Sequence, residues 1–142
     1  MVSSGGFDGL SYEIPDGWEN NSQDGTFSYD YYGDDSWGSI YLWSVSGENT
    51  EFDVEEDFDW SLSYSEDDLD TEVVDSELLT IGDCPAYRIE SVKSYDTFEV
   101  HEIEMEVLSP SGDLVQVYAS CTAEDDELVE QIGEFADSLS FS

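Results

Sequence analysis

Basic side chains are almost missing from this 142-residue chain, which has 2 Lys and Arg together and 1 His against 37 Asp and Glu. The formal net charge is −35 at pH 7. A field of that sign repels nucleic acid phosphates and anionic lipid, and it attracts cations and basic proteins. The composition therefore argues against direct nucleic acid binding and favours an unknown protein partner. Self-repulsion also destabilises the compact state, so folding should depend on salt or on bound cations.

Long hydrophobic runs are missing too. No stretch of 18 apolar residues occurs, so the sequence predicts no transmembrane helix. The opening MVSSGG, residues 1–6, lacks signal-peptide character and is predicted to be a flexible tether, followed by a single domain at 7–142. Such leaders often follow the lipidated cysteine of a bacterial lipoprotein. We therefore expect a secreted or surface-anchored protein whose only membrane contact is a lipid anchor missing from this chain.

Cysteine and histidine are too scarce for several kinds of site. In a simple strand meander, Cys84 and Cys121 lie near opposite ends of the sheet, and about eight residues of offset at about 3.3 Å each far exceed disulfide reach. We predict two free thiols, and the same geometry argues against a zinc site that includes His101. His101 lies on the apolar side of its strand and is interpreted as a partly buried structural residue. No nucleophile motif accompanies a Ser or Cys, so we predict no catalytic residue and no enzyme.

The chain is rich in aromatic residues, which make up 14% of it within a hydrophobic total of 39%. Disordered acidic chains are poor in aromatics, so this composition predicts a folded domain. Even the most acidic stretch has a helical pattern, because Val54, Phe58 and Leu62 recur every four residues. Thr50 is predicted to cap this helix. The helix should end before Asp67, since carboxylates at a helix C-terminus oppose its dipole.

Short apolar or alternating segments predict strands at 10–14, 27–31, 37–45, 73–81, 86–95, 99–108 and 114–120. The strand at 37–45 is apolar on both parities, which predicts that both of its faces are covered. A final helix, capped by Thr122, carries an apolar stripe that ends at Leu139. Arg88 is predicted to pair with Glu104 on a neighbouring strand. Hairpin-length links between the strands indicate an α+β fold, an antiparallel β-sheet flanked by helices in a layered sandwich.

Three short motifs resemble those of Mog1/PsbP-like domains, including their bacterial lipoprotein branch. YEIPDGW at 12–18 resembles the opening strand and P-x-G-W turn, IGDCPAY at 81–87 resembles the I-G-x-x-A strand start, and SLSF at 138–141 resembles the end of the terminal helix. The resemblance implies an antiparallel sheet flanked by helices. It also implies a protein-interaction module, as in a nuclear transport factor, photosystem subunits, secretion chaperones and many bacterial lipoproteins, with no shared catalytic residue.

Oxygen ligands for a cation occur in two places. Residues 20–31 loosely echo a calcium loop, but Tyr31 stands at the twelfth position, where a Glu is needed, and a strand follows. We interpret this segment as a hairpin loop. A cluster of four carboxylates is a weak candidate metal site: Asp67, Asp68, Asp70 and Glu72. No cofactor is predicted beyond weakly bound calcium.

Aromatic side chains gather in the second and third predicted strands. Core packing is the simplest interpretation. If Tyr29, Tyr31, Trp37 or Tyr41 faces solvent instead, these residues form a stacking surface for a sugar or a protein partner.

The sequence thus favours a non-enzymatic, secreted or surface-anchored bacterial interaction domain with a strongly acidic surface. Two other functions stay open. A DNA-mimic inhibitor would occupy a basic nucleic-acid-binding protein, and a cation-binding or halophilic protein would be acidic for reasons of solvation. The near absence of Arg argues against the halophilic interpretation.

Overall fold

The computed structural model describes residues 3–7, 9–23, 26–47 and 51–141. In chain order the elements are β1 (Ser3–Phe7), β2 (Leu10–Ile14), β3 (Glu19–Asn20), β4 (Thr26–Tyr32), β5 (Trp37–Val45), α1 (Val54–Asp67), β6 (Thr71–Ile81), β7 (Cys84–Ser94), β8 (Glu99–Leu108), β9 (Leu114–Thr122), α2 (Asp126–Asp137) and β10 (Ser140–Phe141). Neither helix is long and apolar enough, within these residues, to cross a membrane.

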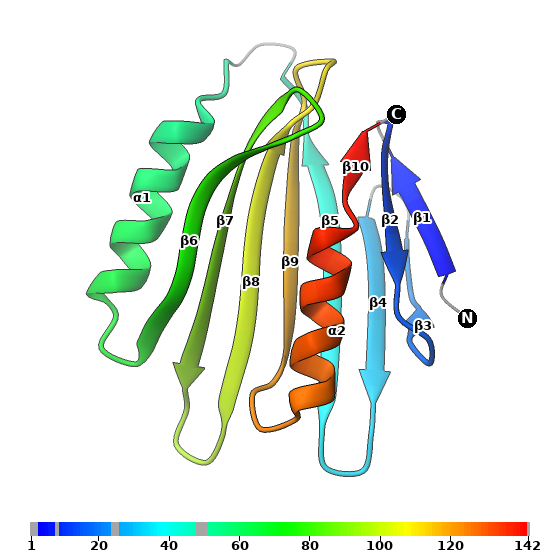
Figure 1. Ribbon diagram of the computed structural model, residues 1–142, viewed down its shortest axis with the longest axis vertical. Coiled ribbons are helices and arrows are strands. Elements are labelled where there is room, and N and C mark those ends of the chain that lie inside the picture. The colour runs from blue at the N-terminus through cyan, green and yellow to red at the C-terminus, as the bar shows by residue number, and fades with distance from the viewer. Residues whose placement is uncertain (1–2, 8, 24–25, 48–50, 142) are drawn as a thin grey trace.

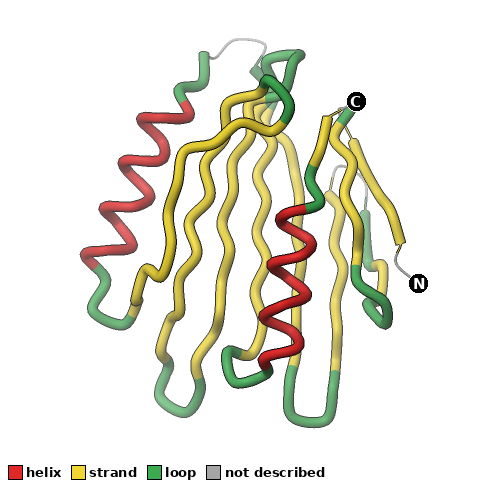
Figure 2. The backbone as a smooth tube through the Cα atoms, in the orientation of Figure 1, coloured by secondary structure: helices red, strands yellow, loops and turns green. Residues whose placement is uncertain are grey.

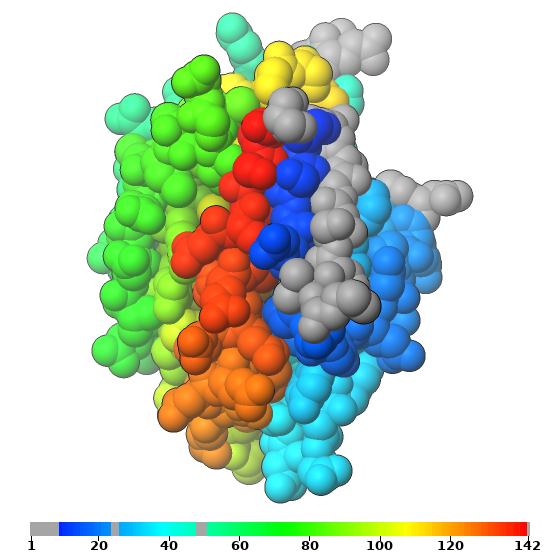
Figure 3. Space-filling view, turned by 45° about the vertical axis from the view of Figure 1, so that its right-hand side comes forward, coloured from blue at the N-terminus to red at the C-terminus, as the bar shows by residue number. Residues whose placement is uncertain are grey.

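A seven-stranded antiparallel sheet forms the centre of the molecule, in the order β3-β4-β5-β9-β8-β7-β6. Tight turns join most neighbouring strands (Figure 2). A small sheet, β1-β2-β10, lies with α2 over one face, and Figure 3 shows α2, β10 and β2 side by side there. The other helix, α1, packs on the opposite face over β6, β7 and β8 (Figure 1). These layers confirm the predicted α+β fold.

The main core lies between the large sheet and α2. The apolar stripe of α2 is buried as predicted, with Leu128, Ile132 and Phe135 each at most 2% exposed. Burying one side chain of this size contributes about 1.5–3 kcal/mol. A second, smaller cluster joins α1 to the opposite face through Val54, with Phe58 and Leu62 packed against it. The predicted four-residue repeat of α1 is therefore confirmed.

Both helices begin with an aspartate cap, not with the threonines predicted. The side chain of Asp53 accepts from Glu56 N at 3.1 Å, and Thr50 lies outside the described residues. At α2 the cap is Asp125, which accepts from Leu128 N at 3.1 Å. Thr122 instead ends β9. Its hydroxyl accepts from the backbone N–H of Trp37, so tertiary pairing takes this side chain away from the helix.

The predicted tether at residues 1–6 is only partly compatible with the structure, because Ser3–Phe7 is strand β1 and pairs with β2 along its whole length. Residues 1 and 2 lie outside the described residues. The sequence did not show this strand, because its small residues have no apolar alternation. The pairing has a physical reason, since it satisfies backbone groups along the edge of β2 that faces away from β10.

The P-x-G-W turn anchors the small sheet against the large one. Gly17 has φ +88°, a left-handed conformation that favours glycine. The turn directs Trp18 onto Gly38 of β5, where an added Cβ would overlap the indole ring. The Trp18 Nε1–H donates to Gln131 of α2 at 3.0 Å. The motif therefore serves packing between the layers.

Candidate functional site: an acidic groove on the open face

One half of the large sheet lacks the cover that was predicted for it. In β5, Ile40 and Leu42 are buried under α2 and the small sheet, but Tyr41 and Val45 on the other parity are 40% and 42% exposed. The prediction that both faces of this strand are covered is therefore wrong. The reason lies in tertiary structure, because α1 packs mainly over β6, β7 and β8 and leaves the β5 side of its face open.

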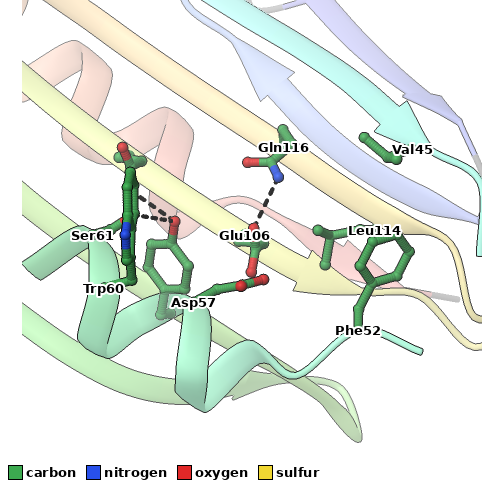
Figure 4. A pocket seen from close by; sticks show the side chains of 10 residues that line it. Val45, Phe52, Asp57, Trp60, Ser61, Glu106, Leu114 and Gln116 are labelled. Atoms are coloured by element: carbon green, nitrogen blue, oxygen red, sulfur yellow. Dashed lines mark hydrogen bonds between the residues drawn. The ribbon is translucent and has the colours of Figure 1, made fainter. Parts of the chain in front are cut away.

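A groove of about 440 Å³ lies where α1 meets this open face. One row of side chains crosses its floor, because Gln116 of β9 pairs with Glu106 of β8, and Glu106 with Tyr87 of β7. From α1, Asp57 lies over this row beside Glu106 (Figure 4). Figure 4 also shows apolar side chains, including Leu114, at one end of the groove and Trp60 at the other.

Glu106 is the most unusual group in the groove, being a carboxyl only 3% exposed. Its Oε1 accepts from Gln116 Nε2 at 2.8 Å, but its buried Oε2 has no donor. Burial first, and then the neighbouring Asp57 carboxyl, raise the pKa of Glu106 to about 8. Because two ionised carboxylates are both acceptors, these two can hydrogen-bond only when one of them carries a proton.

A second carboxylate of the groove, Glu104, belongs to a hydrogen-bonded chain. The Tyr87 hydroxyl donates to Glu104 Oε2 at 2.7 Å and lies 3.3 Å from the Ser61 hydroxyl of α1. Burial, followed by the charge of Glu104, raises the pKa of Tyr87. Tyr87 therefore stays protonated and fixes Glu104 as an acceptor. The prediction that Arg88 pairs with Glu104 is wrong, since Arg88 lies on the opposite face, opposite Met105 in the strand register.

Arg88 instead holds the end of α2. Its Nη1 lies 2.7 Å from Asp137 Oδ1 and its Nη2 lies 3.3 Å from Glu90 Oε1. Burial opposes the guanidinium charge, but the bonds to Asp137 and Glu90 outweigh it and raise the pKa of Arg88. The last turn of α2 contains no basic residue of its own. This ion pair therefore offsets the unfavourable position of Asp137 at the helix C-terminus.

The structure divides the four aromatic residues predicted as an interaction surface. Tyr29 is 4% exposed and its hydroxyl lies 2.9 Å from that of Tyr12, inside the core. Tyr31 is partly buried against Trp18 on the same face. Trp37 and Tyr41 lie on the opposite face of the sheet, because the register of β4 and β5 pairs Tyr29 with Ile40, and Tyr41 is exposed. The four therefore do not make one surface.

Of the exposed aromatic rings on this face, Tyr41 was among the predicted surface residues, whereas Trp60 and Tyr64 of α1 were missed by the sequence interpretation. Tyr41 contacts Trp43 edge to face, with ring centroids 5.1 Å apart. On α1, Trp60 and Tyr64 stack at 5.6 Å and are 69% and 68% exposed. A signal was present, because Trp60 and Tyr64 are four residues apart and lie outside the apolar stripe of α1. Two large exposed rings on one helix are typical of a contact surface.

The candidate cation ligands are used by the chain itself or lie apart. Asp68 accepts from the Asp70 N–H at 2.9 Å and from the Thr71 hydroxyl at 3.1 Å, and these bonds hold its pKa below the usual range. Lys93 Nζ lies 3.8 Å from the same carboxylate. Among the described residues, no three His, Cys, Asp or Glu side chains are placed to hold a metal ion. In the segment read as a calcium loop, β3 and β4 pair as a hairpin.

The remaining reactive residue types have structural roles. Cys84 and Cys121 are both free and buried, which confirms the prediction against a disulfide. Burial, followed by the charge of Asp125, raises the pKa of the Cys121 thiol to about 12. His101 Nε2 lies 2.7 Å from Glu90 Oε2, and its side chain is 12% exposed. The interpretation of His101 as a partly buried structural residue is therefore confirmed.

Solved structures with the same architecture come from distant organisms. LpqN of Mycobacterium tuberculosis, involved in cell envelope biogenesis, has a TM-score of 0.69 at 14% identity, over 100% of this chain and 91% of its own. The Ran-binding protein Mog1p of Saccharomyces cerevisiae has a TM-score of 0.64 at 9% identity, over 99% of this chain and 95% of its own. The PsbP protein of Synechocystis sp. PCC 6803 has a TM-score of 0.60 at 18% identity, over 100% of this chain and 92% of its own.

No family model and no curated protein matches the sequence. The structural similarity nevertheless extends over the whole chain, and the motifs at 12–18 and 81–87 occupy the turn and the strand start that the resemblance implied. The SLSF motif does not end the helix as expected, because α2 ends at Asp137 and Ser140–Phe141 forms strand β10. The chain therefore has the Mog1/PsbP-like fold.

Proposed function

We propose that this chain is a non-catalytic interaction domain of a secreted or cell-surface bacterial protein, and that its groove binds a basic segment of a protein partner. The groove itself carries the proposal. It places the carboxyls of Asp57, Glu104 and Glu106 beside the exposed ring of Trp60. Carboxylates and aromatic faces together attract a cationic side chain through charge and through cation–π contact.

Three further observations support the proposal. The net charge of −35 steers basic partners toward the molecule. LpqN is involved in cell envelope biogenesis, which agrees with an envelope location, and Mog1p is a Ran-binding protein, which agrees with a binding function. Cys121 lies opposite His101 in the strand register, but the raised pKa of its buried thiol keeps it protonated, and His101 Nε2 is bonded to Glu90.

A capped peptide of alternating arginine and serine tests the groove, with the tryptophan indole N–H signals as reporters in an NMR titration. We expect the signal of Trp60, which lines the groove, to shift. The signal of Trp18, which is bonded to Gln131 on the other side of the sheet, should stay in place. The same peptide with glutamate in place of arginine should shift none of them.

Two variants of matched exposure sharpen this test. Trp60→Ala should weaken peptide binding about two- to fivefold, the size of an exposed cation–π contact. Tyr32→Ala removes a ring that is 73% exposed, on strand β4 outside the groove lining, and should leave binding unchanged. Equal effects of the two variants, or shifts spread evenly over all indole signals, would show diffuse charge attraction and refute the proposed site.

A further inference from the structure

The groove contains a group whose bonding is incomplete. The Oε2 atom of Glu106 is buried and has no N–H or O–H donor, while Gln116 satisfies Oε1. Asp57, which lies beside Glu106 in Figure 4, offers only another carboxyl. A buried carboxyl beside a second, half-buried one needs either a shared proton or a cation between the two.

The chain cannot supply that cation itself, since its basic side chains are committed elsewhere. Arg88 pairs with Asp137 and Glu90 on the other face of the sheet. Lys93 lies 3.8 Å from Asp68, at the end of β7 remote from Tyr87. His101, on the same face as Arg88, is bonded to Glu90.

We propose that the Asp57–Glu106 pair is the receptor for one arginine side chain of the partner, whose guanidinium displaces the proton shared by the two carboxyls. This inference rests on the proposed function and names the chemistry recognised at that site. The half-buried Asp57 side chain forms the outer wall, so it turns aside to admit the guanidinium. The displaced proton leaves to solvent, and the pair becomes two carboxylates bridged by one cation.

Guanidinium fits this arrangement better than other cations do. Its planar fork of donors can bond two carboxylates at once, and its flat face stacks on aromatic rings. Trp60 supplies such a ring at the groove, with most of its surface open. An ammonium ion is a compact point charge that stays strongly hydrated. A metal ion is disfavoured, because no third ligating side chain joins the pair within the described residues.

The groups around Glu106 make arginine binding depend on pH. Asp57 faces it from α1 and Glu104 precedes it on β8, while β7 contributes the neutral Tyr87 and β9 the amide of Gln116. Burial and these two carboxyls raise the pKa of Glu106 to about 8, so the pair holds a proton near neutral pH. Binding that expels this proton should tighten by up to about tenfold for each pH unit up to about 8 and then level off.

Calorimetry with the arginine–serine peptide, in two buffers of different ionisation enthalpy, measures the displaced proton directly. At about pH 7 we expect close to one proton released for each peptide bound. The peptides with lysine or neutral citrulline in place of arginine are the ligand controls. Arginine should bind at least about tenfold more tightly than citrulline, the size of a charged hydrogen bond, and also more tightly than lysine.

Glu106→Gln keeps the shape of the side chain but removes the ionisable group. It should abolish proton release and weaken arginine binding by about tenfold or more. Glu130→Gln removes the same charge from the exposed side of α2 and should change neither quantity. The fold of each variant is checked by circular dichroism.

Three outcomes would overturn the inference: no proton release from the wild-type protein, equal binding by Glu106→Gln, or equal binding of the arginine and lysine peptides. If one of these outcomes occurs but Trp60→Ala still weakens peptide binding and Tyr32→Ala does not, the groove binds cations without preference for arginine, and the proposed function stands. If Trp60→Ala and Tyr32→Ala have equal effects, the proposed function fails as well.

Discussion

Replacing Glu106 by Gln should make this protein more stable at alkaline pH, although the replaced residue is buried and bonded. The glutamine amide reproduces the shape of the protonated carboxyl. Its oxygen can accept from Gln116, as Oε1 of Glu106 does at 2.8 Å, and its NH₂ can donate to Asp57. The variant therefore keeps the contacts of the folded state and loses only the charge that Glu106 acquires on titration.

The size of the effect follows from the pKa of Glu106. In the unfolded chain this carboxyl titrates near 4.5 and in the folded protein near 8, so between these values the folded state holds the extra proton. The stability contributed by Glu106 is therefore fully present below about pH 4.5 and is lost as the pH rises to about 8. At about 1.4 kcal/mol for each pH unit, the loss is at most about 5 kcal/mol. Water at the groove mouth screens the charge, so we expect about 2–3 kcal/mol.

Urea unfolding followed by tryptophan fluorescence, from about pH 4 to about pH 9, measures this difference. The other carboxylates are the same in both proteins, so their contribution largely cancels in the comparison. Glu106→Gln and wild type should have nearly equal free energies of unfolding at the acid end, and the variant should exceed wild type by about 2–3 kcal/mol at the alkaline end.

Glu130→Gln is the matched control and should differ from wild type by only a few tenths of a kcal/mol at every pH, as is usual for an exposed site. A difference between Glu106→Gln and wild type that does not change with pH would refute the reasoning. So would a variant that is less stable than wild type at alkaline pH, because Glu106 would then be favourably ionised in the folded protein.

Four further outcomes are expected. Arg88→Ala should lower the free energy of unfolding by about 1–3 kcal/mol in urea titrations, because it removes the bonds that a largely buried guanidinium makes to Glu90 and Asp137; an unchanged midpoint would show that this ion pair is dispensable. Gly38→Ala should cost about 1–3 kcal/mol by the same assay, since the new methyl group overlaps Trp18. Neither Cys84 nor Cys121 should react with a thiol reagent in the native protein, and both should react after unfolding, because their burial raises both thiol pKa values. The thermal midpoint, followed by circular dichroism, should rise with NaCl and rise equally with CaCl₂ at matched ionic strength, as screening requires; a larger rise with calcium would establish a specific cation site.

Local patterns in the sequence were enough to place most of the fold. The four-residue repeat through Val54 and Phe58 identified α1. In the predicted strand at 99–108, residues two positions apart share a face, and the structure places Glu104 and Glu106 together in this way. Such periodicities report which side of an element is buried, and each element needs only its own residues to show them. The turns and strand lengths, set by Gly and Pro, indicated an antiparallel arrangement.

The site depended on contacts between elements that no local pattern encodes. Alternation put Glu106 on the same face as the half-buried Glu102 and Glu104, and only the packing of α1 against β7 and β8 buries it beneath Asp57. The same holds for Arg88, whose partner Asp137 is 49 residues away in the chain. The sequence by itself therefore determined the elements, their apolar faces and the excess of negative charge. The tertiary structure alone decided which carboxyl lost its water and gained a raised pKa, because desolvation depends on what the rest of the chain places around a group.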